Sequence, residues 1–249
     1  MSLIVPLYPH PALSVSSGNK KYIVLSDLHI GFDYAFHAKG IQIDPTYDSD
    51  RMIEEVTSLI TEHQAEAIVL LGDTKHTIGF INKYEWRAIP EFLSTISKYT
   101  EVYFVPGNHD GNMGRIIPDN INLISTKGMV LEDTLLIHGH TMPSRRQSFI
   151  KRIIMGHLHP TFYNKDSIIN GQRVWLYFKV DKTSIFPNEK GTIEIIVVPS
   201  FSTHFDLKEN PRQVGTHLIS PIAKRILEDN SVIDSIVVTL DGYVVACNR

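Results

Sequence analysis

Five short apolar runs mark the first part of the chain, and each is followed by Gly, Asp, Asn or His. The runs are almost continuously apolar instead of alternating with polar residues, which is typical of strands covered on both faces. The pattern therefore predicts strands inside a layered fold. The runs are KYIVLS at 21–26, AIVLL at 67–71, EVYFV at 101–105, TLLIH at 134–138 and KRIIM at 151–155.

Two segments between these runs have helical periodicity. Apolar residues recur at helical spacing over 52–60, after Asp48 and Ser49 as capping residues. They do so again over 86–96, where Pro90 marks either a first turn or a kink. The order strand, helix, strand, helix, strand implies mostly parallel neighbours joined by right-handed crossovers.

The later part of the chain, 172–249, is rich in strand patterns. Asp241-Gly242 is a strong signal for a two-residue hairpin turn, so a second, more antiparallel sheet is expected there. The segment 181–190 has the composition of a surface loop. Because no repeat, low-complexity tract or linker-like stretch occurs, we expect residues 1–249 to form a single domain.

Composition limits the function classes. The 249 residues carry a formal net charge of -3, so no global basic field attracts a polyanion. The single cysteine, Cys247, excludes an internal disulfide and a Cys-type zinc site, and it favours a cytoplasmic location. No run approaches the roughly 18 apolar residues of a spanning helix, and the proline-interrupted start does not read as a signal peptide.

Polar residues follow each of the five predicted strands. Taken singly, each group could be a turn carboxylate or a surface histidine. The carboxyl ends of parallel strands converge, however, so five strand ends with metal-capable side chains favour one shared site. The groups are Asp27-x-His29, Gly72-Asp73, Gly107-Asn108-His109-Asp110, His138-Gly139-His140 and Gly156-His157-x-His159.

This ordered set, spanning residues 22–159, resembles the signature of calcineurin-like metallophosphoesterases. The whole chain further resembles the archaeal SbcD-related phosphoesterase branch of that superfamily. The resemblance implies an α/β fold, classed as α+β in some schemes. It would be a four-layer αββα sandwich of two mixed sheets flanked by helices.

The resemblance also implies two adjacent divalent metal ions. Asp27, His29 and His159 would hold one ion, Asn108, His138 and His157 the other, and Asp73 would bridge them. Carboxylate, imidazole and amide ligands suit Mn²⁺, Fe²⁺, Zn²⁺ or Ni²⁺, and the resemblance favours Mn²⁺. In the His138-Gly139-His140 motif either imidazole could reach the metal, and the motif position favours His138.

The implied reaction is hydrolysis of a phosphodiester by in-line attack of a metal-bridging hydroxide. His109 resembles the family's general acid, and Asp110 is expected to orient its imidazole. His76 departs from the family pattern, because many members have Asp at that position. It could face the substrate, support a ligand, or simply cap the following loop.

The substrate is less constrained. Arg145 and Arg146 lie between the last two histidine motifs, where they could contact a phosphate backbone or form an ordinary solvated loop. The SbcD-related branch implies a DNA or RNA nuclease, with a helicase or other repair protein as a partner by analogy. The alternatives are a phosphodiesterase or phosphatase for small or cyclic nucleotides, and a non-catalytic scaffold on the same fold.

Overall fold

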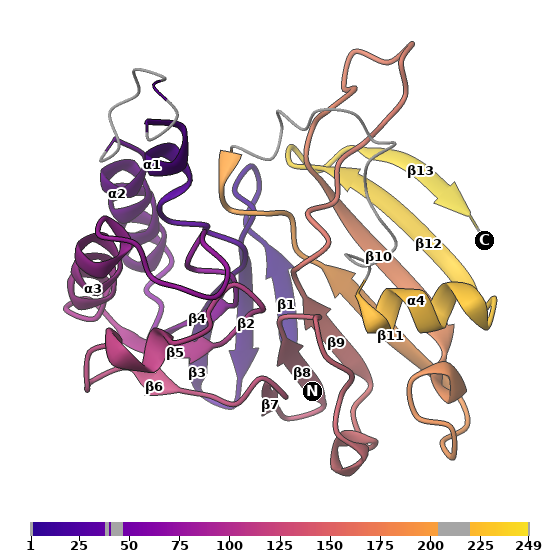
Figure 1. Cartoon of the computed structure of the whole chain (residues 1–249). Coiled ribbons are helices and arrows are strands. Elements are labelled where there is room, and N and C mark those ends of the chain that lie inside the picture. Colours follow the sequence, from indigo (N-terminus) through magenta and orange to yellow (C-terminus); the bar gives the residue numbers. More distant parts are fainter. Residues whose placement is uncertain (1, 38–39, 41–46, 204–219, 249) are drawn as a thin grey trace.

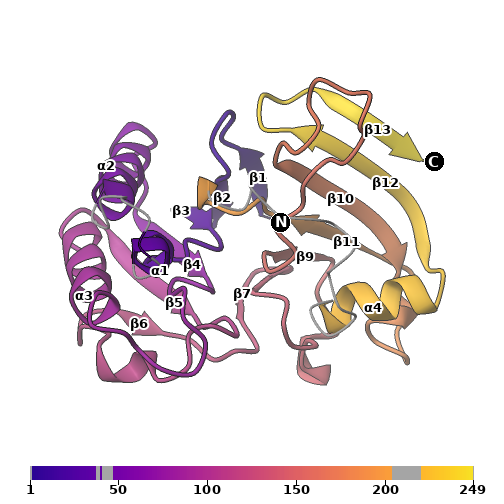
Figure 2. The same cartoon turned by 45° about the horizontal axis from the view of Figure 1, so that its top comes forward.

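Two β-sheets packed face to face form the centre of the structure, a computed structural model that describes residues 2–37, 40, 47–203 and 220–248. Helices lie on the outer side of each sheet, which gives the four layers of the predicted sandwich (Figure 1). The same order of layers is visible when the molecule is turned so that its top comes forward (Figure 2). The predicted fold class is therefore confirmed.

The first sheet has six strands, which lie side by side in sequence order. A hairpin of the first two strands pairs antiparallel with the third, and the remaining neighbours are parallel. The parallel strands therefore end at the same edge of the sheet. The strands are β1 (Leu3–Pro6), β2 (Leu13–Ser17), β3 (Lys20–Leu25), β4 (Ala67–Leu71), β5 (Glu101–Val105) and β6 (Asn122–Leu123).

Helices α1 (Phe32–His37), α2 (Tyr47–Glu62) and α3 (Glu85–Ile96) lie beside this sheet (Figure 1). In β3, Ile23 and Leu25 belong to the cluster packed under α2 and α3, whereas Val24 faces the second sheet. This burial on both faces explains why the parallel strands are continuously apolar. The predicted capping residues Asp48 and Ser49 lie inside the first turn of α2.

The second sheet has seven strands in the order β13-β12-β10-β11-β9-β8-β7. Neighbours pair antiparallel except that β9 is parallel to both β8 and β11. Helix α4 (Pro221–Glu228) packs on its outer face through Ile222 and Ile226. The strands are β7 (Met129–Leu131), β8 (Thr134–Ile137), β9 (Arg152–Met155), β10 (Val174–Asp181), β11 (Thr192–Val197), β12 (Val232–Thr239) and β13 (Val244–Asn248).

Three expectations from the sequence need correction. The start of the chain forms the hairpin of β1 and β2, which was not predicted because three prolines interrupt its apolar pattern. The segment 181–190 is not a simple loop: it contains the 3₁₀-helix η3 (Lys182–Ser184), and Ile185 and Phe186 are buried under the second sheet. The predicted hairpin exists between β12 and β13, but its connection covers 240–243 instead of two residues.

The described helices include none that is both long and apolar enough to cross a membrane. This agrees with the absence of a long apolar run in the sequence.

The side chain of Trp175 is fully buried between the two sheets, where it packs in the hydrophobic cluster that joins them. We expect Trp175→Ala to lower the free energy of unfolding by roughly 3–5 kcal/mol, because the removed ring leaves a cavity in a packed interior. Urea unfolding followed by far-ultraviolet circular dichroism measures this loss. Trp86→Ala is the control, since Trp86 is 48% exposed on α3 and its loss should cost about 0.5 kcal/mol or less. Equal losses would contradict the role given to Trp175.

Candidate metal centre

The predicted site residues come from the carboxyl ends of strands in both sheets. Asp27 and His29 follow β3, Asp73 follows β4, His138 follows β8, and His157 with His159 follows β9. The structure brings these side chains together in two groups that share Asp73. The first group is Asp27, His29, Asp73 and His159, and the second is Asp73, His138 and His157.

The backbone at these positions is unusual. Nine described residues other than glycine have a positive φ angle, and five of them belong to the two groups: Asp27, His29, Asp73, His157 and His159. This left-handed conformation is sterically unfavourable for residues with a side chain, and such residues cluster at functional sites. Backbone hydrogen bonds hold it in place, from Asp27 N–H to Gly72 and from His29 N–H to Asp73.

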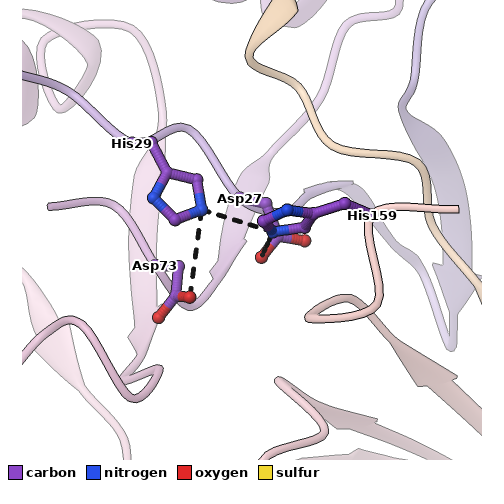
Figure 3. A group of neighbouring side chains, drawn as sticks. All are labelled: Asp27, His29, Asp73 and His159. Atoms are coloured by element: carbon purple, nitrogen blue, oxygen red, sulfur yellow. Dashed lines mark hydrogen bonds and ion pairs between the residues drawn. The ribbon is translucent and has the colours of Figure 1, made fainter. Parts of the chain in front are cut away.

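The first group converges on one point between the loops after β3, β4 and β9 (Figure 3). His159 Nε2 lies 3.0 Å from Asp27 Oδ1 and 3.3 Å from His29 Nε2. His29 Nε2 lies 3.9 Å from Asp73 Oδ2. Imidazole nitrogens and carboxylate oxygens thus face one another in a buried setting, which fits a cation between them.

The second group shares Asp73 with the first. His138 Nε2 is 3.4 Å from Asp73 Oδ2 and 3.2 Å from Asn108 Oδ1. His138 Nδ1–H donates to the carbonyl of Leu71 over 2.8 Å, so Nε2 is directed towards Asp73 and Asn108. Asn108 Oδ1 therefore lies beside the second group, and its role as a ligand stays a prediction.

The electrostatics of the centre favour bound positive charge. Burial opposes the ionisation of Asp27, yet His159 and His138 lower its pKa to about 2. Burial also opposes a charge on His138, but its hydrogen bond to Asp73 and the charges of Asp73 and Asp27 raise its pKa to about 9. The carboxylates of Asp27 and Asp73 thus stay ionised although they are buried, and they favour a protonated His138. Divalent cations would supply the same compensation and compete with that proton.

His109 also faces this centre. Its backbone N–H donates to Asp73 Oδ1 over 2.9 Å, and its Nε2 lies 3.8 Å from Asp73 Oδ2. Its Nδ1–H donates to the backbone carbonyl of His76. The ring is therefore fixed with Nε2 directed towards the candidate metal site.

The predicted contact between Asp110 and His109 is wrong. The two carboxylate oxygens of Asp110 accept the backbone N–H groups of Gly107 over 2.7 Å and Lys75 over 3.0 Å. Burial, together with the charge of Asp73, raises the pKa of Asp110 to about 6. Asp110 thus ties the loop after β5 to the loop after β4, and the His76 carbonyl orients His109.

His76 and His140 both lie beside the site. The ring of His76 is 5.8 Å from that of His29 and 4.9 Å from that of Phe32. The ring of His140 is 5.3 Å from that of His138, and burial with the charge on His138 lowers its pKa to about 4. Of the His138-Gly139-His140 motif, His138 therefore belongs to the second group, and His140 lies next to it.

Arg145 and Arg146 lie on the 3₁₀-helix η2 (Arg145–Gln147), and both are exposed. Arg145 lines a surface hollow of about 340 Å³ together with Phe186 and Pro187. The hydrogen bonds within the described ranges link neither arginine to the metal-capable residues. Their contact with substrate stays a prediction. Among the histidines outside the motifs, His10 pairs with Glu55 over 2.9 Å, and His204 and His217 lie outside the described residues.

The glycines of the strand-end motifs had no role assigned from the sequence, although the structure requires them. A Cβ atom at Gly156 would lie 1.7 Å from Ser26 Oγ and 2.5 Å from Asp27 Oδ2. One at Gly107 would lie 2.1 Å from Asp73 Oδ1. The glycines that precede Asn108 and His157 therefore allow the loops to approach the carboxylates closely.

We expect Gly156→Ala to weaken Mn²⁺ binding by roughly 10- to 100-fold, the usual effect of disturbing a group that supports a metal ligand. The added methyl group would push Asp27 and Ser26 aside. Isothermal titration with Mn²⁺ measures the change. Gly111→Ala is the matched control, since a Cβ atom there meets nothing within 4 Å. Unchanged binding in Gly156→Ala would argue against Asp27 as a ligand.

Comparisons with known proteins come from sequence and from structure. The sequence profile described as calcineurin-like phosphoesterase matches residues 20–237. No protein of curated function matches the chain significantly in sequence. Nuclease MPE of Pseudomonas putida superposes with a TM-score of 0.55 and 15% identity, over 98% of this chain and 100% of its own. The phosphoesterase Yfce from E. coli gives a TM-score of 0.40 and 15% identity, over 91% and 97%.

At this low identity, the likeness to nuclease MPE shows a shared fold over the whole chain. The family profile covers most of the sequence, from the start of β3 into β12, and includes every motif that carried the predicted resemblance. The chain belongs to the calcineurin-like phosphoesterase family.

Proposed function

We propose that the chain is a metal-dependent phosphodiesterase with two divalent ions and that DNA or RNA is its substrate. The observation that carries the proposal is the pair of buried donor groups that share Asp73. One ion would be held by Asp27, His29 and His159, and the other by Asn108, His138 and His157. Mn²⁺ is the first candidate, and these donors also suit Zn²⁺, Fe²⁺ and Ni²⁺.

When bound, two such ions supply an activated water and polarise the phosphoryl oxygens. Asp73 would keep both ions in fixed relation to the scissile phosphate. His109 would protonate the departing oxygen from Nε2, because its other ring nitrogen is engaged by the His76 carbonyl.

Support for a nucleic-acid substrate comes from the fold of nuclease MPE and from the resemblance to the SbcD-related branch. The single cysteine, Cys247, leads us to propose a cytoplasmic enzyme, and the lack of a linker-like stretch in the sequence leads us to propose a single domain over residues 1–249. The resemblance to the SbcD-related branch leads us to propose a helicase or other repair protein as a partner. A formal net charge of -3 limits binding of nucleic acid by charge alone, so recognition would depend on local contacts at the site.

The proposal is tested by hydrolysis of bis-p-nitrophenyl phosphate and of labelled single- and double-stranded DNA and RNA. Each reaction is run with Mn²⁺ and again with excess chelator. Metal-dependent cleavage of a polynucleotide is the expected result. Cleavage of only the small diester would replace the nuclease by a phosphodiesterase for small molecules, and cleavage of neither would favour a scaffold.

A further inference from the structure

The segment 76–82, directly after the loop that carries Asp73, presents two large apolar side chains to solvent. Ile78 and Phe80 are each 63% exposed, and Gly79 between them has a φ angle of +82°. Phe80 N–H donates to the carbonyl of Ile78, which closes a tight turn at this tip. Single exposed apolar residues need no explanation, but two at the tip of a loop beside a candidate active site indicate a contact surface.

Two buried charged residues hold this segment in shape. Lys75 and Glu85 are both fully buried, and Lys75 Nζ donates to the carbonyls of Thr77 and Phe80. Glu85 accepts the backbone N–H groups of Thr77 over 2.8 Å and Asn82 over 2.9 Å. Burying such charges is costly unless each is paired and hydrogen-bonded. Here each of the two side chains is hydrogen-bonded to the backbone of the exposed tip, and these bonds fix the conformation of the tip.

The tip is also tied to His109, the candidate general acid. The carbonyl of His76 accepts His109 Nδ1–H, and the carbonyl of Gly79 accepts Asn112 Nδ2–H over 2.8 Å. Two hydrogen bonds therefore join the segment 76–79 to the segment 109–112. A general acid lies next to the departing oxygen. The tip thus lies on the side from which the alcohol leaves.

We infer that Ile78 and Phe80 bind the leaving group of the substrate, and that this group is a nucleoside whose base stacks on Phe80. The inference rests on the proposed phosphodiesterase function and adds the substrate group recognised at one side of the scissile phosphate. An aromatic ring held on a preorganised backbone suits a planar base, because stacking requires a fixed ring and little hydrogen bonding. Ile78 would supply apolar contact beside it.

The test uses dinucleotides with Mn²⁺, either intact or with an abasic residue on the side of the departing alcohol. Loss of the base leaves the departing alcohol chemically similar, so a difference in kcat/KM reports recognition of the base. We expect the wild-type enzyme to prefer the intact dinucleotide by roughly tenfold, mainly through KM, the usual scale for one stacked base. Phe80→Ala should abolish this preference and leave the abasic substrate unaffected, and Phe80→Trp should restore it.

Tyr99→Ala is the matched control, since Tyr99 is 57% exposed just before the start of β5, at the opposite end of that strand from His109. It should keep the wild-type preference. An equal preference in wild type and Phe80→Ala, or none in wild type while bis-p-nitrophenyl phosphate is hydrolysed, would overturn the inference alone. No metal-dependent hydrolysis of any diester would instead overturn the proposed function, and this inference with it.

Discussion

Asp73→Ala is expected to lower phosphodiesterase activity by roughly 10³-fold or more, because one carboxylate serves both groups of donors. Its Oδ2 atom lies 3.4 Å from His138 Nε2 and 3.9 Å from His29 Nε2, between the two groups. Without it, neither group keeps its full set of ligands, and two ions would lose the anion between them. The measurement is kcat/KM for bis-p-nitrophenyl phosphate at saturating Mn²⁺.

Two controls make that result interpretable. Asp119→Ala removes an exposed carboxylate from the loop before β6 and should leave the rate unchanged. Asp73→Asn keeps the size of the side chain and removes its charge, so it separates loss of charge from local collapse. Turnover within about tenfold of wild type in Asp73→Ala would exclude a bridging role, since removal of one key electrostatic group alone commonly costs more.

His109→Ala is expected to have an effect that depends on the leaving group. Hydrolysis of a dinucleotide should fall by roughly 10²- to 10⁴-fold, the usual contribution of general acid catalysis. Hydrolysis of bis-p-nitrophenyl phosphate should fall far less, because p-nitrophenolate departs without protonation. Mn²⁺ binding should be unchanged, since His109 Nδ1 is bound to the His76 carbonyl and the ring lies outside both donor groups.

Parallel assays of the two substrates, with an isothermal titration of Mn²⁺, separate these effects. His63→Ala provides the control, because His63 lies just after α2 and belongs to none of the motifs. An equal loss on both substrates would argue against proton donation to the leaving group. Loss of bound Mn²⁺ in His109→Ala would instead indicate a ligand.

The strands and the metal-capable residues could be predicted because both leave strong patterns in the sequence. Buried parallel strands are continuously apolar, and their carboxyl ends converge, so Asp27 and Asp73 could be placed at one edge from their positions alone. His157 follows β9 of the second sheet, which also brings its carboxyl end to the site. The family resemblance then divided the ligands into two sets. The structure arranges the described side chains in the same two groups, although their roles as ligands stay predictions.

Features that depend on backbone geometry could not be predicted. Positive φ angles at Asp27 and His29 could not be assigned from residue type, because Asp and His are enriched in this conformation but still adopt it only rarely. The hydrogen-bond partners of Asp110 also depend on backbone geometry. Adjacency in sequence suggested His109, whereas the fold directs the carboxylate to the backbone of Gly107 and Lys75.

The burial of the charged residues Lys75 and Glu85, outside the metal-site motifs, could not be predicted from the sequence either. Lysine and glutamate are almost never fully buried unless they are paired, so the sequence suggests that Lys75 and Glu85 lie on the surface. In the structure both are fully buried. Only the three-dimensional structure shows that each is bound to the backbone of the segment 76–82. That segment includes His76, the position at which the sequence departs from the family pattern.

Anomalous diffraction from crystals soaked in Mn²⁺ tests the two-metal centre most directly, because it locates the ions independently of activity. The account predicts two Mn²⁺ peaks roughly 3.5–4 Å apart on either side of the Asp73 carboxylate. One peak would lie against Asp27, His29 and His159, and the other against Asn108, His138 and His157. A single peak, or peaks away from Asp73, would contradict the two-metal centre and the mechanism built on it.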